Sequence, residues 1–82
     1  MNKVKISAAI SIEGSVRDCD REFSDKRENF RGLFDIGYVS NNRVGGTWVG
    51  KTEYIFEVSA LRSDMPTIIS ILKEFGFKTK YI

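Results

Sequence analysis

Apolar and polar residues alternate from Val4 to Ile12, and this pattern constrains the fold more than any other feature of the chain. The even positions are all apolar, whereas the odd positions hold mostly lysine and serine. Side chains of a β-strand point alternately to its two faces, so one face of this segment should pack on a core. The other face should be open to water or to a partner. The segment therefore predicts a strand in a sheet that is buried on one side.

The chain is too short to form more than one core. It has 82 residues, and a chain of this size buries only about 60–65 % of the surface that its unfolded form exposes. Hydrophobic residues make up 41 % and charged residues 29 % of the sequence, as is typical of a globular protein. We expect a single domain spanning residues 1–82.

Cysteine and histidine usage restricts the chemistry that is available. Cys19 is the only cysteine, and the chain has no histidine. A lone cysteine cannot form an internal disulfide, which is typical of a reducing cytoplasm, so we expect a cytoplasmic protein. Histidine is the commonest metal ligand and the commonest proton carrier near neutral pH. We therefore expect no metal, no cofactor and no catalytic site.

Aromatic residues after the first strand recur at helical spacing. The positions are Phe23, Phe30, Leu33 and Phe34. They predict a helix from about residue 20 to 34, stopped by Gly37. Ser15, Asp20 and Ser24 are alternative capping residues, so the start of this helix stays open.

The second half of the chain predicts two strands, a helix and a last strand. Strands are expected at 36–40 and 52–61, with Tyr54 and Phe56 on the buried face. An apolar stripe after Pro66, ended by Gly76, predicts the second helix. Residues 77–82 alternate again and predict a short strand. The order βαββαβ is that of a ferredoxin-like α+β fold, a four-stranded antiparallel sheet with two helices on one face.

This fold places four lysines near one another. Its usual strand order makes the first and last strands neighbours, so Lys3 and Lys5 should lie beside Lys78 and Lys80. Such a cluster predicts nucleic-acid binding through phosphates, or it keeps a solvated sheet edge from aggregating. RNA-recognition domains instead stack bases on aromatic residues of the exposed sheet face. That face has no aromatic residue here on the first and third strands.

Two segments of the sequence resemble parts of known functional motifs. Acylphosphatases share this element order, and the segment Gly14-Ser15-Val16-Arg17, with Asn41 and Asn42, resembles their phosphoryl-binding loop in part. The second glycine and the Phe-Arg pair of that motif are missing. Asp18, Asp20 and Glu22 alternate as in a calcium loop, but Phe23 and Asn29 replace its glycine and its final glutamate. Acidic residues also suit the first turn of a helix.

The connection between the two central strands carries the best candidate for a binding site. Gly45-Gly46 is compatible with a two-residue hairpin turn, and the hairpin could extend beyond the core. The candidate contact residues are Arg43, Val44, Trp48, Val49 and Lys51. Tryptophan and arginine are enriched at interface hot spots. The alternative is that Trp48 folds back over the sheet.

These observations favour a small non-enzymatic protein that binds a macromolecule. We expect a protein partner, engaged through the glycine-rich hairpin and the adjoining exposed sheet face. Phage accessory proteins that inhibit a host factor are similar in size and composition, which favours inhibition of that partner. Nucleic-acid binding through Lys3, Lys5, Lys78 and Lys80 is the alternative. A second copy of the chain is another candidate partner, because edge strands can pair. No segment predicts a membrane span.

Overall fold

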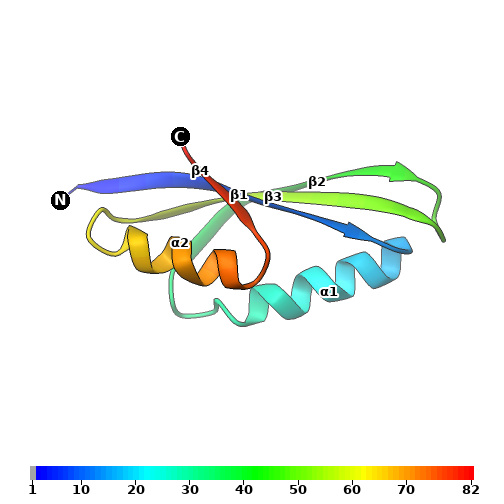
Figure 1. Ribbon diagram of the computed structural model, residues 1–82, viewed down its shortest axis with the longest axis horizontal. Coiled ribbons are helices and arrows are strands. Elements are labelled where there is room, and N and C mark those ends of the chain that lie inside the picture. Colours follow the sequence, from blue (N-terminus) through cyan, green and yellow to red (C-terminus); the bar gives the residue numbers. More distant parts are fainter. Residues whose placement is uncertain (1) are drawn as a thin grey trace.

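The computed structural model describes residues 2–82 and contains one antiparallel sheet with two helices on one of its faces (Figure 1). The elements are β1 (Lys3–Glu13), α1 (Val16–Glu28), β2 (Asp35–Gly45), β3 (Gly50–Leu61), α2 (Met65–Glu74) and β4 (Lys78–Tyr81). The strands lie in the order β2-β3-β1-β4, so the first and last strands are neighbours. The predicted ferredoxin-like α+β fold is confirmed.

The alternation in β1 separates the two faces of the sheet. Ile6 and Ala8 are fully buried beneath the helices, and so are their neighbours Phe56 and Val58 on β3. The opposite side of the sheet faces away from both helices, and we call it the open face. Its residues are Lys3, Lys5, Ser7, Ala9, Ser11 and Glu13 of β1, Asp35, Ser40, Asn42 and Val44 of β2, Lys51, Glu53, Ile55, Glu57, Ser59 and Leu61 of β3, and Lys78 and Lys80 of β4.

The two helices follow one another along the sheet (Figure 1). Helix α1 lies under the end that carries the β2–β3 hairpin, and α2 lies under the end that carries both chain termini. The molecule is correspondingly long, with extents of 45 × 22 × 17 Å. Each helix therefore covers its own half of the sheet.

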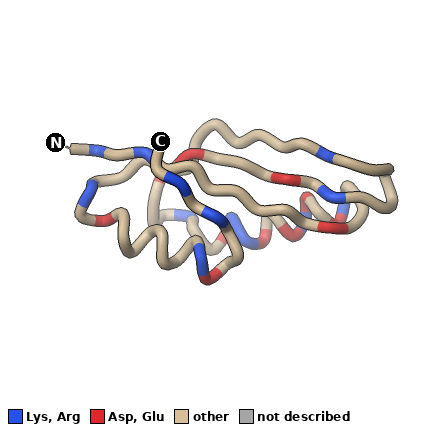
Figure 2. The backbone as a smooth tube through the Cα atoms, turned by 45° about the horizontal axis from the view of Figure 1, so that its top comes forward, with Lys and Arg blue, Asp and Glu red and all other residues tan. Residues whose placement is uncertain are grey.

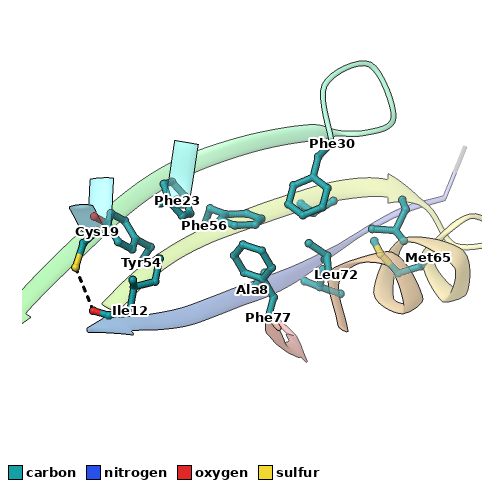
Figure 3. Close-up of a cluster of buried hydrophobic side chains, with 13 residues drawn as sticks. Ala8, Ile12, Cys19, Phe23, Phe30, Tyr54, Phe56, Met65, Leu72 and Phe77 are labelled. Carbon is teal, nitrogen blue, oxygen red and sulfur yellow. Dashed lines mark hydrogen bonds between the residues drawn. The ribbon is translucent and has the colours of Figure 1, made fainter. Parts of the chain in front are cut away.

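A row of aromatic rings joins the two halves of the core (Figure 3). Phe23 of α1 stacks on Tyr54 with ring centroids 4.2 Å apart. Phe77, just before β4, packs edge-on against Phe56 at 5.3 Å and against Phe30 at 5.6 Å. The ring of Phe77 thus lies between the part of the core under α1 and the part under α2.

Helix α1 begins and ends earlier than the sequence predicted. It runs from Val16 to Glu28, and the Ser15 hydroxyl accepts the N–H of Asp18 at 3.1 Å. The buried stripe of the helix is Cys19 and Phe23, one turn apart. The chain turns after Glu28, and Gly32 has a φ of +81°. Phe30 is still buried, but from a turn instead of a helix.

A hydrogen bond to the end of α2 lets the charged residue Lys26 occupy an inward position of α1. Its side chain is half-buried, and its Nζ donates to the carbonyl oxygen of Phe75 at 3.1 Å. Phe75 is the C-cap of α2, where backbone carbonyls lack partners and carry partial negative charge. The aliphatic stem of Lys26 covers apolar surface while its ammonium group links the ends of the two helices.

Strand β2 forms one free edge of the sheet, and its pairing with β3 is interrupted. The register shifts between Gly37 and Ser40, which marks a β-bulge. Tyr38 lies in the bulge with a φ of +56° and is 79 % exposed. A tyrosine in the left-handed region is strained by roughly 1 kcal/mol or more.

Candidate partner-binding site

The β2–β3 hairpin closes through a four-residue loop and not through the predicted Gly45-Gly46 turn. Gly45 pairs with Gly50, and the N–H of Gly46 donates to the carbonyl of Val49 at 2.8 Å. Gly45 has a φ of +109°, and a Cβ there would lie 2.7 Å from the Cα of Gly50. Gly45 and Gly50 are thus needed for the close approach of β2 and β3. We call residues 44–49 the tip.

The tip is tied to the corner between β1 and α1, so the hairpin does not extend freely beyond the core. The N–H of Val16, the first residue of α1, donates to the carbonyl of Thr47 at 2.9 Å. The N–H of Gly14 donates to the carbonyl of Gly50 at 2.9 Å. Strand β1 also runs beside β3 as far as Lys51. The loop is therefore held by backbone hydrogen bonds on its helix side.

Arg43 adds side-chain hydrogen bonds to this connection. The residue lies opposite Thr52 on the helix side of the sheet, where its Nη1 donates to Thr52 Oγ1 at 2.8 Å. Its Nη2 donates to the carbonyl of Gly14 at 2.7 Å, and its Nε to the carbonyl of Gly46 at 3.0 Å. The Cys19 thiol lies 3.7 Å from Nη1. Arg43 is half-buried, and its hydrogen bonds within the chain support the tip. Its contact with a partner stays a prediction.

Gly50 leaves room for this guanidinium group. A Cβ at Gly50 would lie 2.9 Å from Nη2 of Arg43 and 2.6 Å from the carbonyl oxygen of Val44. Both distances are shorter than real Cβ contacts, so a side chain at Gly50 would displace either the arginine or the strand. The glycines around the tip thus serve a fixed geometry and not a flexible one.

The tip exposes three large apolar side chains. Val44 is 71 %, Trp48 is 83 % and Val49 is 80 % exposed. Trp48 therefore does not fold back over the sheet, and its contact with a partner stays a prediction. A rigid loop that exposes a tryptophan between two valines has the composition of an interface hot spot. Lys51, the remaining predicted contact residue, is exposed on the open face opposite Glu13.

The structure places three of the four predicted lysines, Lys5, Lys78 and Lys80, along the contact between β1 and β4, whereas Lys3 lies beyond the end of β4. Lys80 pairs with Ser7, and Lys78 pairs with Ala9. The N–H of Ile82 donates to the carbonyl of Lys5, which places Lys5 close to the end of β4. In Figure 2, blue segments of β1 and β4 accordingly lie near the two termini. On the other side of Ser7, β3 presents the acidic residue Glu57.

The backbone after β1 is not arranged as a phosphoryl-binding loop. The N–H groups of Gly14 and Val16 donate to the hairpin, and that of Asp18 donates to Ser15 Oγ. Asn41 and Asn42 follow one another in β2 and pair with Tyr54 and Glu53, so their side chains point to opposite faces of the sheet. The segment 14–17 and the residues Asn41 and Asn42, which in part resemble the acylphosphatase motif, therefore do not form a common phosphoryl-binding site.

Asp20, one of the three acidic residues that alternate in α1, has a structural partner. The hydroxyl group of Tyr54 donates to Asp20, and burial together with this hydrogen bond raises the pKa of Tyr54 well above its ordinary range. Among residues 2–82, no group of three acidic or thiol side chains is placed to hold a metal ion. Cys19 is buried, and its thiol donates to the carbonyl of Ile12 at 3.3 Å (Figure 3).

Two structural residues at this end were missed by the sequence analysis. Thr47 contributes its carbonyl, and Gly14 contributes both backbone groups, to the connection between tip and helix. Ser15 was one of three alternative caps, and the sequence favoured a helix start near residue 20. The proximity of Gly14 and Ser15 to the hairpin depends on the register of three strands. No local sequence signal carries that register.

Comparison with known proteins adds no functional information. The sequence matches no protein-family model and no curated protein. In the described part of the chain, no helix is both long and apolar enough to cross a membrane.

Proposed function

We propose that this protein is a non-enzymatic binding protein whose tip engages another protein. The observation that carries the proposal is the exposure of Trp48 and its two valine neighbours on a loop that is fixed in place. Exposed large apolar groups are costly in water unless a partner covers them. A loop that is already ordered loses little conformational entropy on binding.

The proposal extends to regulation of the partner. A small cytoplasmic protein without a catalytic constellation acts by occupying a surface, so inhibition of the bound protein is the simplest outcome. The resemblance in size and composition to phage accessory proteins supports this extension. The lone reduced thiol of Cys19 supports the cytoplasmic location.

The test compares affinity capture from a cell lysate by three tagged forms of the protein. The tip variant is Trp48→Ser with Val49→Ser, and the matched control is Leu33→Ser, which changes another exposed apolar residue, at 59 % exposure. We expect the wild type and the control to retain the same protein and the tip variant to bind it about 30-fold more weakly, as for a hot-spot tryptophan. Equal retention by all three forms would show that the tip is not the contact.

Nucleic-acid binding through the lysine cluster is the second candidate function. It is supported by the position of Lys78 and Lys80 beside the start of β1, and it is opposed by the acidic residues on β3. The same capture experiment, repeated with nuclease, separates the two functions. Binding that is retained after nuclease and lost in the tip variant supports the protein partner. Gel retardation that weakens steeply with salt would support the nucleic acid.

A further inference from the structure

The charges of the open face follow an ordered pattern across the strands. Four lysines, Lys3, Lys5, Lys78 and Lys80, lie on β1 and β4. The acidic residues Asp35, Glu53 and Glu57 lie on β2 and β3. Near the tip the order is reversed, because Glu13 lies on β1 and pairs with Lys51 on β3. In Figure 2 blue segments mark β1 and β4 at the terminal end, and red segments lie on the neighbouring strands.

These charges are not neutralised by ion pairs within the chain. Within residues 2–82 the structure contains one ion pair, between Arg31 and Glu28, and it lies on the helix side. The open face therefore has basic strands on one side and acidic strands on the other. Between them lie small or apolar residues, among them Ala9 and Ile55, which pair with each other.

We propose that the open face binds the open face of a second copy of this chain, related by a two-fold axis parallel to the strands. The axis passes above the boundary between β1 and β3. Rotation about this axis leaves each residue at the same position along the strand direction. It places β1 of one copy over β3 of the other, and β4 over β2. The basic strands of each copy thus face the acidic strands of the other. The proposal shares Val44 with the tip, but it does not rest on the function proposed for the tip.

The register shows how completely the charges match. Lys80 and Glu57 both pair with Ser7, so they lie at the same position along the strand direction. Lys5 and Asp35 likewise both pair with Ser59. After rotation, Lys80 stands beside Glu57 of the second copy, and Lys5 beside Asp35. Facing sheets are about 10 Å apart, a gap that a lysine and a carboxylate side chain can bridge.

Two further pairs follow from the same rotation. Lys51 faces Glu13 of the second copy, since the two residues are partners in the β1–β3 register. Lys78 pairs with Ala9, and Glu53 pairs with Ser11, the next residue of β1 on the same face. After rotation, Lys78 and Glu53 of the second copy are therefore offset by only two residues along the strand direction. A two-fold axis perpendicular to the strands would instead stack β4 on β4 and bring Lys78 close to Lys80. Charge complementarity therefore selects the parallel axis.

The shape of the face agrees with this arrangement. Strand β4 pairs only with residues 6–9 of β1, and beyond it the surface is hollowed by about 290 Å³ beside Ile10, Gly76 and Lys78. The rotated copy places its β2 over β4, so that its Asn42 and Val44 stand over this hollow. Val44 projects from the open face and is 71 % exposed. The short last strand thus makes room for the longer second strand.

The size of the face predicts a reversible dimer. Four strands at the usual spacing and rise give roughly 500 Å² of flat sheet in each copy. Stable interfaces bury about 800 Å² per partner. We therefore expect association that depends on the charge pairs and weakens as salt screens them.

Charge reversal tests the pairing directly. One variant carries Lys78→Glu and Lys80→Glu, and the other carries Glu53→Lys and Glu57→Lys. Each variant alone places like charges opposite each other, whereas an equimolar mixture restores every pair in a heterodimer. The control, Arg17→Glu with Arg21→Glu, makes the same change of charge on exposed residues of α1. The molecular mass of each sample is measured by sedimentation at low and at high salt.

We expect the nuclease-treated wild type and the control to dimerise at low salt and to dissociate at high salt. Each reversed variant should bind itself at least about 100-fold more weakly, and the mixture should recover the dimer. Circular dichroism of each variant confirms that it is folded. The proposal is overturned if the wild type stays monomeric at millimolar concentration, if the mixture does not associate, or if association requires bound nucleic acid.

Discussion

At the scale of single residues, Arg43 determines how the tip is presented. The sequence singled it out as a contact residue because arginine is frequent at interfaces. Its position opposite Thr52 turns it to the helix side, where its donors bind Gly14, Gly46 and Thr52. This orientation depends on a register shared by β2 and β3 after a bulge, which no local pattern in the sequence reveals.

Replacing Arg43 should loosen the tip and destabilise the fold. Arg43→Ala leaves the carbonyls of Gly14 and Gly46 without this donor, and we expect the free energy of unfolding to fall by about 2 kcal/mol. Urea denaturation measures the change, and fluorescence anisotropy of Trp48 reports the added motion of the loop. Val44→Ala, which alters an exposed residue of the same strand, is the control. A change below about 0.5 kcal/mol would contradict the supporting role of Arg43.

Tyr54 makes stability depend on pH in the alkaline range. Burial first, and then the hydrogen bond to Asp20, raise its pKa in the folded state above the ordinary value of 10.0. The folded state therefore holds the phenolic proton more tightly than the unfolded state. The stabilising contribution is complete below pH 10 and is lost as the pH rises above it. We expect tyrosinate absorbance from Tyr54 to develop only as the circular dichroism signal disappears.

The variant Tyr54→Phe separates this effect from general alkaline unfolding. It keeps the stacking surface against Phe23 but removes the hydroxyl group. The late stage of tyrosinate absorbance should vanish. The unfolding temperature, measured at each pH between about 8 and 11, should depend less on pH than in the wild type. Ionisation of Tyr54 in the folded protein would contradict the assignment.

At the scale of elements, β1, β3, β4 and α2 were predictable, whereas α1 was not. Strand β2 was expected only at 36–40, but it continues through Asn41 and Asn42 to Gly45. Strict alternation located β1, and the apolar stripe between Pro66 and Gly76 located α2, with Gly76 at a φ of +90° as expected after a helix. Helix α1 was misplaced because Cys19 was not counted in its buried stripe, and because Lys26 occupies an inward position. The aromatic spacing beyond residue 28 belongs to a turn that packs on the same core.

Ser15 should stabilise α1, although Ser24 and Asp20 were equal candidates from sequence. Ser15→Ala removes the acceptor for the N–H of Asp18, and we expect a loss of about 1 kcal/mol. Ser15→Asp should retain most of the stability. Ser24→Ala is the matched control, because Ser24 lies exposed inside the helix, where alanine is at least as favourable. Thermal or urea unfolding measures all three, and equal effects of the two alanine variants would contradict the assigned helix start.

At the scale of the whole molecule, the two halves of the core depend on the central phenylalanine rings. Phe77 is buried and contacts the rings of Phe30 and Phe56. Phe77→Ala should lower the free energy of unfolding by about 3–5 kcal/mol, a large part of what a chain of this size possesses. Leu33→Ala, in an exposed loop, should change it by less than about 0.5 kcal/mol. Urea denaturation followed by circular dichroism compares the two, and a small effect of Phe77→Ala would show that the halves fold without this ring.

The proposed dimer would place two tips at the same end of the assembly. The two-fold axis runs parallel to the strands, so rotation leaves the hairpin end of each copy where it was. A partner with two matching sites, or two copies of a partner, would then meet a pair of tryptophans and gain from their combined attachment. The fixed loops and the open face would in that case serve one function together.

The bulge at Tyr38 has a consequence for how copies of this chain can meet. An incoming strand that paired with β2 would lose its register at the bulge, where the backbone bends and a tyrosine holds a left-handed conformation. Growth of the sheet from its edge would stop after a few residues, so stacking of chains into fibres is disfavoured. Association through a face about a two-fold axis, in contrast, is finite and ends with two copies. One strained tyrosine thereby helps to keep a protein with a bare sheet surface from polymerising.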